Sequence, residues 1–564
     1  MKAFNTVLLS LFVLFISVEC SRTSHDQSGS LLPSKIEADS GQQTAKGYVF
    51  HDKNNNLIKD SEEKGISGII VSNGADLVQT DESGMYEIPV SEDAIVFVIK
   101  PANWKTPVDE NNLPQFFYRH NTSGYPENYT FPGEEPTGAL PEFINFPLYP
   151  SPSPEQFKIA VFGDTQPYNI EQVDFIAEDI VTELIGRSDI AFGLTMGDIV
   201  GDHLDLFNPL NEAVGKIGLP WYNVMGNHDI NYMSPNDELS DETYERVYGP
   251  ATYAFEYGKV NFIVMDDIIH ESEAGSHNYT GGLSEDQIMF IRNYLATVPK
   301  ENLVVLNMHI PFETGMEGYD SYRDEDQKAI FELMKEFPHT LSISAHTHIH
   351  DNIFFHKDSS AWLQEKPHHH YNTGTTCGSW WTGFRGETDI PHTMMRDGTP
   401  NGYSIISFDG NQYITDWIVA GSSENHKMNI HVPRGIEAGS SDTVLLTVNF
   451  FNGSVESDVQ YRIDGLTEWK TMNQAFEYDP YFMKLVQRWK NIINLGFQEQ
   501  WENDTEASKT KFPGYKIPRP EKCTHIWQAN IGSEWPAGRH LIEVKATDRY
   551  GRTFIDYHPM RVVK

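Results

Sequence analysis

Carboxylate, amide and imidazole side chains recur directly after a series of short apolar runs in the middle of the chain. In order they are Asp164, Gln166, Asp198, Asn227, His228, Asp229, His309, His346 and His348. Such oxygen and nitrogen donors suit hard-to-borderline divalent ions such as Mn, Fe or Zn, and they do not make a thiolate zinc site. Because residues two apart in an extended segment point the same way, His346 and His348 can face one cavity together. A lone His or Asp is more often a surface or capping residue, whereas this recurrence predicts a metal centre.

The elements that would position these side chains are continuous apolar runs, which are typical of strands buried on both faces. They cover residues 158–162, 190–196, 221–225, 261–265, 303–308 and 340–344. Helices are expected between them, for example over 170–185 and 285–295. This alternation predicts an α/β layered fold with ligands bound outside the carboxyl ends of the strands. Only the run over 261–265 leads to no recognised ligand set, since Asp266 and Asp267 alone follow it.

These motifs resemble those of the calcineurin-like metallophosphoesterases. The family's blocks D-x-H, G-D-x-x, G-N-H-D/E, a single H and G-H-x-H are recognisable in order over roughly residues 160 to 350. The resemblance implies a layered β-sandwich flanked by helices, in a domain over 155–425 with a dinuclear centre. By the same resemblance, Asp164, Asp198 and His348 would bind one ion, and Asp198, Asn227, His309 and His346 would bind the other, with Asp198 bridging. His228 would lie beside the leaving group, oriented by Asp229.

Two positions depart from the family pattern. Gln166 replaces the usual His of the first block, so it can offer an amide oxygen but no imidazole nitrogen, which should weaken or reshape the first ion site. Gln166 is therefore a candidate ligand whose role stays open. Ala345 replaces the usual Gly of the last block, a milder change because a methyl group is tolerated wherever φ is not positive.

A dinuclear centre of this kind implies an enzyme that hydrolyses phosphate esters. Two cations about 3.5 to 4 Å apart can clamp a phosphoryl group and lower the pKa of a shared water toward about 7, so that no enzyme nucleophile is needed. His228 suits the remaining task of protonating the departing oxygen. We expect a small or protein-borne phosphate ester as substrate, with monoesters preferred over diesters or pyrophosphates. The alternative from another class is a surface binding protein that has lost activity through Gln166.

The N-terminal residues indicate export. Residues 1–20 combine Lys2 with an apolar run over 7–18 that is too short to span a membrane, as in a signal peptide. Residues 17–20 resemble a bacterial lipobox, although Glu19 stands where the pattern has a small residue. We expect a protein of the periplasm or cell envelope. It is either lipid-anchored through Cys20, the one membrane contact expected, or cleaved nearby and secreted.

Regions rich in β-like patterns flank the central domain. A polar linker is expected over 21–43. Alternating runs separated by Gly and Asn turns predict an N-terminal β-sandwich over 44–150, which resembles Cna-B or carboxypeptidase-regulatory modules. Further runs predict a mainly-β C-terminal domain over 427–564. The whole arrangement resembles exported bacterial phosphoesterases with companion domains at both ends, and these domains specify no chemistry of their own.

One loop of the N-terminal region has oxygen ligands spaced as in an EF-hand. Positions one, three, five, nine and twelve are Asp52, Asn54, Asn56, Asp60 and Glu63, and Ile58 offers a carbonyl at position seven. Leu57 departs from the pattern, which has Gly at position six for a sharp turn. The loop is either a structural calcium site or a solvated acidic turn.

The remaining features limit the function classes. A formal net charge of −38 argues against nucleic-acid binding, which requires surplus Lys and Arg. Cys377 and Cys523 are expected to be separate thiols. We expect residues 368–370, three consecutive His, in a loop with at most one His pointing inward and none as a ligand. The segment with Trp380, Trp381, Phe384 and Arg385, together with residues 394–403, either shapes the pocket mouth or packs in the core against the last domain.

Overall fold

The computed structural model describes residues 32–271, 277–314, 316, 322–439, 444–465, 468–492, 514–515, 517–532 and 535–564. The predicted signal peptide, Cys20 and the first part of the predicted linker lie outside the described residues. Residues 32–564 belong to one compact unit, so the domain borders expected near residues 150 and 427 stay predictions. Among the described helices, none has the length and apolar character needed to cross a membrane.

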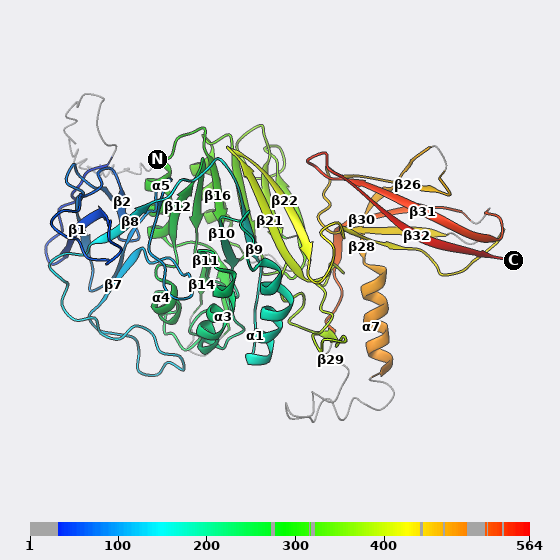
Figure 1. The fold of residues 1–564 in the computed structure, drawn as a ribbon, viewed down its shortest axis with the longest axis horizontal. Coiled ribbons are helices and arrows are strands. Elements are labelled where there is room, and N and C mark those ends of the chain that lie inside the picture. Colours follow the sequence, from blue (N-terminus) through cyan, green and yellow to red (C-terminus); the bar gives the residue numbers. More distant parts are fainter. Residues whose placement is uncertain are drawn as a thin grey trace, which may run out of the picture. The chain divides into compact units, whose positions relative to one another are not determined.

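The central region contains two facing sheets, which confirms the expected α/β layered fold (Figure 1). The five-stranded sheet has the order β11 (Trp221–Val224), β10 (Phe192–Met196), β9 (Gln156–Phe162), β21 (Gly402–Asp409) and β22 (Gln412–Val419). The six-stranded sheet has the order β12 (Tyr253–Tyr257), β13 (Val260–Val264), β16 (Leu303–Asn307), β17 (Thr340–Ser344), β19 (His368–Thr373) and β18 (His350–Phe355). Within each sheet, the strands that lead to predicted site residues pair in parallel. Their carboxyl ends therefore share one edge of each sheet.

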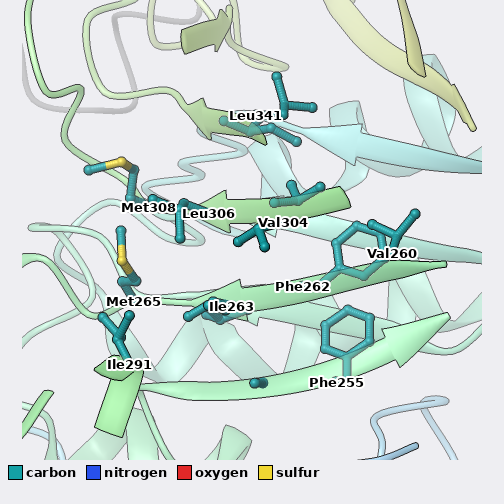
Figure 2. Close-up of a cluster of buried hydrophobic side chains, with 14 of the residues drawn as sticks. Phe255, Val260, Phe262, Ile263, Met265, Ile291, Val304, Leu306, Met308 and Leu341 are labelled. Atoms are coloured by element: carbon teal, nitrogen blue, oxygen red, sulfur yellow. The ribbon is translucent and has the colours of Figure 1, made fainter. Parts of the chain in front are cut away.

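Both faces of these sheets are covered, which explains why the strands read as continuous apolar runs. One buried cluster joins Ile159 and Val161 of β9 to Phe262 of β13, and Figure 2 shows Phe262, Val304 and Leu341 within it. The alternate residues of β9, Ala160 and Phe162, belong to a second cluster that includes helical side chains from α1 (Ile170–Ile176) and α3 (Phe207–Val214). Successive residues of a strand point to opposite faces, so β9 must be apolar throughout.

Both helices expected from the sequence are present in the structure. The expected helix over 170–185 is one helical stretch in three parts: α1, a π-helical turn over Ala177–Val181 and α2 (Thr182–Leu184). The expected helix over 285–295 is α5 (Glu285–Leu295), where Ser284 and Gln287 form a capping box. Helices α4 (Glu242–Tyr248) and α6 (Asp324–Met334) complete the central region.

Two further pairs of sheets flank the central region. The N-terminal pair contains β1 (Gln43–His51), β2 (Ile70–Ser72), β3 (Leu77–Gln79), β4 (Met85–Val90), β5 (Asp93–Val98), β6 (Trp104–Lys105), β7 (Phe117–Asn121) and β8 (Phe146–Pro150). The C-terminal pair contains β23 (Met428–His431), β24 (Ile436–Glu437), β25 (Leu445–Phe450), β26 (Asp458–Ile463), β27 (Lys470–Thr471), β28 (Asn473–Tyr478), β30 (Lys522–Asn530), β31 (Gly538–Thr547) and β32 (Thr553–Val563). Helix α7 (Pro480–Ile492) follows β28. Two short ribbons, β14 (Ile268–His270) with β15 (Tyr279–Gly281) and β20 (Gly383–Phe384) with β29 (Gly514–Tyr515), complete the sheets.

Candidate metal centre

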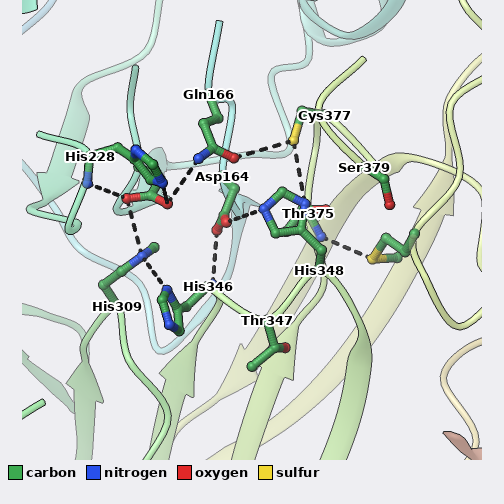
Figure 3. Close-up of polar contacts among 12 residues, drawn as sticks. Asp164, Gln166, His228, His309, His346, Thr347, His348, Thr375, Cys377 and Ser379 are labelled. Carbon is green, nitrogen blue, oxygen red and sulfur yellow. Dashed lines mark hydrogen bonds and ion pairs between the residues drawn. The ribbon is translucent and has the colours of Figure 1, made fainter. Parts of the chain in front are cut away.

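Sharp turns after the strands bring the predicted site residues together. Asp164, Gln166, Asp198, His346 and His348 all have left-handed backbone, with φ of 27°, 41°, 46°, 68° and 53°. Such φ values are uncommon for residues with a side chain and persist only where the surroundings enforce them. The labelled side chains of Gln166, His228, His309, His346 and His348 turn toward one another around Asp164 (Figure 3).

The glycines of the motifs allow these turns to approach closely. A Cβ on Gly197 would lie 2.3 Å from His309 Nδ1, and a Cβ on Gly226 would lie 2.0 Å from the backbone nitrogen of Asp198. Real Cβ atoms do not approach other atoms so closely. The glycine before Asp198 and the glycine before Asn227 are therefore required by packing at the site.

One group of donor atoms surrounds Nε2 of His309. The Nδ1–H of His309 donates to the Met196 carbonyl at 2.8 Å, so Nε2 is the ring nitrogen that faces the other donor atoms. This Nε2 lies 3.1 Å from Asn227 Oδ1, 3.2 Å from Asp198 Oδ1 and 3.2 Å from His346 Nδ1. Burial and the charge of His309 lower the pKa of His346 to about 3, which leaves that ring neutral. Carboxylate, amide and imidazole donors that converge in this way fit a cation.

A second group surrounds Asp164. The Nδ1–H of His348 donates to the Gly378 carbonyl at 2.7 Å, which turns Nε2 toward Asp164 Oδ2 at 3.1 Å. Asp164 Oδ2 is buried and has no hydrogen-bond partner among the described residues. A buried carboxylate oxygen without a donor is costly, and an ion between it and His348 would remove that cost.

Asp198 lies between the two groups. Its Oδ1 faces His309, and its Oδ2 lies 3.2 Å from Gln166 Nε2. Rotating the Gln166 amide by half a turn would present Oε1 there instead, so its role as a ligand stays a prediction. Burial lowers the pKa of His309, but the charge of Asp198 raises it more, to about 10. Without a cation, the His309 ring therefore keeps a proton at the point where the donor atoms meet. A divalent ion would displace this proton.

His228 lies beside this cluster, and the structure corrects its predicted partner. Its Nδ1–H donates to Asp202 Oδ1 at 2.6 Å, whereas the Asp229 carboxylate accepts from the backbone nitrogens of Ile199, Val200 and Gly226 at 2.9 to 3.0 Å. The prediction that Asp229 orients His228 is wrong, because the Asp229 side chain turns inward to satisfy these otherwise unpaired N–H groups. Asp202 was missed, although it closes the motif that begins at Gly197.

The environment of His228 favours its protonated form. Burial lowers the pKa of His228, but Asp198 and the hydrogen-bonded Asp202 raise it more, to about 9. Its Nε2 lies 3.9 Å from Asp198 Oδ2, and 24% of the side chain is exposed. The ring thus presents a proton toward the donor cluster from its solvent-facing side.

The structure also places the predicted histidine run, the two tryptophans and the two cysteines. Residues 368–370 begin the buried strand β19, so the expectation of a loop with at most one inward His is wrong. His368 and His370 contact Ser342 at 2.8 and 2.6 Å. Trp380 lies 4.3 Å from the His348 ring between centroids, while Trp381 packs in the second buried cluster. A role of Trp380 in shaping the pocket mouth stays a prediction. Cys377 and Cys523 are separate free thiols, as expected.

Three family models match the chain in order. They are described as N terminal of Calcineurin-like phosphoesterase (residues 52–136), Calcineurin-like phosphoesterase (residues 157–350) and C terminal of Calcineurin-like phosphoesterase (residues 370–554). No curated protein matches the chain.

Three of the similar solved structures are 11 to 15% identical to this chain. A dimetal phosphatase from Danio rerio is 15% identical, with a TM-score of 0.32, over 47% of this chain and 97% of that chain. A purple acid phosphatase from yellow lupin (Lupinus luteus) seeds is 12% identical, with a TM-score of 0.34, over 62% and 67%. PhoD is 11% identical, with a TM-score of 0.36, over 73% and 84%.

Proposed function

Because the chain belongs to the calcineurin-like phosphoesterases, we propose that it hydrolyses phosphate monoesters at a centre of two divalent metal ions. Membership of this family identifies the chain as a metal-dependent phosphoric ester hydrolase. The preference for monoesters is our own proposal. The observation that carries it is the convergence of carboxylate and imidazole donor atoms on both sides of Asp198.

The proposed ligand sets follow this convergence. Asp164, His348 and Asp198 would hold one ion, with Gln166 as a further candidate; Asp198, Asn227, His309 and His346 would hold the other. The donors suit Mn, Fe or Zn. When bound, such ions polarise a phosphoryl group and lower the pKa of a water, so that it can lose a proton and attack this group near neutral pH. The glycine-supported turns hold the ligands in place before any ion arrives, which reduces the cost of ordering the site.

His228 supplies the proton. With Nδ1–H fixed on Asp202, the Nε2–H is directed toward the donor cluster, where the departing oxygen would lie. As this oxygen gains negative charge, the proton on Nε2 moves to it, and His228 recovers a proton from solvent through its exposed edge. Two ions and an imidazolium match the two negative charges of a monoester better than the single charge of a diester, which supports the proposed preference.

The experiment is a comparison of a chromogenic aryl monoester with the matching diester. The purified chain is stripped with a chelator and reloaded separately with Mn, Zn or Fe. We expect turnover only after reloading, with kcat/KM for the monoester about tenfold or more above that of the diester. Faster turnover of the diester would contradict the monoester preference but would still support the assignment as a phosphoric ester hydrolase. No turnover of either ester with any metal would favour the binding-protein alternative.

We further propose a structural calcium ion in the loop over 52–63. Asp52 and Glu63 are buried, and the amide nitrogens of Asn54 and Asn56 both donate to Asp60 Oδ2, at 2.8 and 3.0 Å. Leu57 has a φ of 65°, the left-handed conformation for which the EF-hand pattern uses Gly. The missing Gly therefore does not prevent the turn.

Calcium should raise the melting temperature of the wild-type chain. At a concentration about 100 times its Kd, a ligand stabilises the folded state by about 2.7 kcal/mol, which predicts an increase of several degrees. Glu63→Gln keeps the size of the side chain but removes the charge at position twelve, so the response should disappear. Melting curves with calcium, and with magnesium as the control, test this. An equal calcium response in both proteins would contradict the site.

We propose that the chain is exported to the periplasm or cell envelope, with Cys20 as a lipid-anchor site. This rests on the signal-like pattern of residues 1–20. Cys20→Ala should move the protein from the membrane fraction to the soluble fraction, as measured by immunoblotting after fractionation. Unchanged partitioning would remove the anchor and leave secretion after ordinary cleavage.

A further inference from the structure

A buried ion pair joins the phosphoesterase region to the C-terminal β-region. Nε2 of His525, on β30, lies 3.1 Å from Oδ2 of Asp397, and the two side chains are 1% and 0% exposed. Burial opposes ionisation, yet the charge and hydrogen bond of His525 keep the pKa of Asp397 below its usual value. Removing two charges from water costs several kcal/mol per ion, so a buried ion pair adds little to the stability of the fold. Stability alone therefore does not explain why this pair is present.

The loop that carries Asp397 holds the backbone next to a candidate metal ligand. The backbone nitrogen of Arg396 donates to the His348 carbonyl at 3.0 Å, and that of His350 donates to Asp397 Oδ2 at 2.6 Å. The loop therefore binds the chain on both sides of Ile349. His346 and His348 have left-handed backbone, which persists only if the surroundings hold it. The Asp397 oxygen that pairs with His525 also accepts one of these two hydrogen bonds.

The C-terminal region fixes this loop at several points. Asn449 accepts a hydrogen bond from His525 Nδ1 at 2.8 Å and donates to the Asp397 carbonyl at 3.1 Å. It thereby fixes the ring orientation that directs Nε2 at Asp397. Farther along, Glu521 donates from its backbone nitrogen to the Arg396 carbonyl at 2.8 Å and forms an ion pair with the Arg396 guanidinium.

We propose that His525 is a positioning residue for the metal centre, acting through Asp397 on the backbone of His348. This inference rests on the proposed function, because it assumes that His348 holds an ion. The C-terminal region then does more than attach or solubilise the enzyme: it fixes the position of one ligand. Ligand-supporting contacts of this kind typically change metal affinity or activity by about 10- to 100-fold.

The test measures metal affinity directly. Wild-type chain, His525→Ala and His525→Gln are loaded with zinc, and the release of zinc to a chromophoric chelator is titrated. We expect His525→Ala to weaken retention of one of the two ions by about 10- to 100-fold, while KM for the ester at saturating zinc stays within about twofold. His525→Gln keeps an N–H that can bond Asp397 and should recover most of the affinity.

Val544→Ala is the matched control for loss of stability. Val544 is fully buried in the C-terminal core, on β31, and belongs to a cluster that does not include Asp397 or His525. It should lower the melting temperature without changing zinc affinity. Equal zinc affinity in His525→Ala and Val544→Ala would overturn the inference.

A second variant covers the case in which His525→Ala does not fold. Asp397→Asn removes the charge but keeps the shape, and it should weaken zinc retention in the same way. Wild-type affinity in Asp397→Asn would overturn the inference. A wild-type chain that binds no zinc and hydrolyses neither ester would instead refute the proposed function, so the two failures are distinguishable.

Discussion

Asp198→Ala is expected to abolish metal binding and hydrolysis together. Its Oδ1 faces His309 at 3.2 Å and its Oδ2 faces Gln166 at 3.2 Å, so the carboxylate belongs to both proposed ligand sets. Its loss leaves neither ion with a full set. We expect less than about one ion per chain, and a fall in kcat/KM of about four orders of magnitude or more. Elemental analysis after gel filtration and steady-state kinetics measure the two quantities.

Asp205→Ala is the matched control, because Asp205 is an exposed carboxylate on the same connection. It should retain both ions and full activity. Asp198→Asn separates charge from shape: its amide keeps one acceptor oxygen, so it should bind metal more weakly than the wild-type chain and more strongly than Asp198→Ala. An Asp198→Ala protein that holds two ions and still hydrolyses the monoester would contradict the bridging role.

The positions of most site residues along the chain could be predicted, because the apolar runs and the motifs that follow them both mark the ends of buried strands. Strands such as β9 and β16 are covered on both faces, so they appear in the sequence as apolar runs, and the candidate ligands follow their carboxyl ends. Gly197 and Gly226 stand where neighbouring turns approach most closely. The α/β layering and most of the converging residues therefore followed from the pattern, while the division into two ligand sets came from the family resemblance.

Side-chain direction could not be predicted in the same way. Asp202 and Asp229 are both carboxylates at the ends of site motifs, and only the path of each turn decides which one meets His228. The three histidines of β19 were expected in a loop, since the sequence does not reveal that Ser342 on β17 would satisfy two of them. The Asp397 and His525 pair spans 128 residues, a separation over which no local periodicity applies.

His228→Ala should separate metal content from rate. His228 is proposed to touch the substrate and not the ions, so the variant should keep about two ions per chain while kcat falls by about 100-fold or more. The loss should be largest for alkyl phosphates and small for aryl phosphates with acidic leaving groups, because a leaving oxygen that is already stable as an anion needs no proton. His228→Asn, which keeps a donor but cannot transfer a proton, is the control for a purely binding role.

Asp202→Asn tests the same assignment through pH. Asp202 is one of the groups that raise the pKa of His228 to about 9, so removing its charge must lower that pKa. An acid catalyst works in its protonated form, and its contribution is lost as pH rises through its pKa. The alkaline limb of the kcat profile for an alkyl phosphate should therefore move to lower pH in Asp202→Asn.

The Asp202→Asn shift should be absent when the leaving group needs no proton. If His228 is the acid, an aryl phosphate with an acidic leaving group should show the same alkaline limb in wild type and Asp202→Asn, because proton donation no longer limits its rate. A role of Asp202 in metal binding would instead move both profiles and lower the metal content. The pair of substrates thus distinguishes a proton donor from a structural residue, and loss of metal in His228→Ala would show that His228 is not the acid.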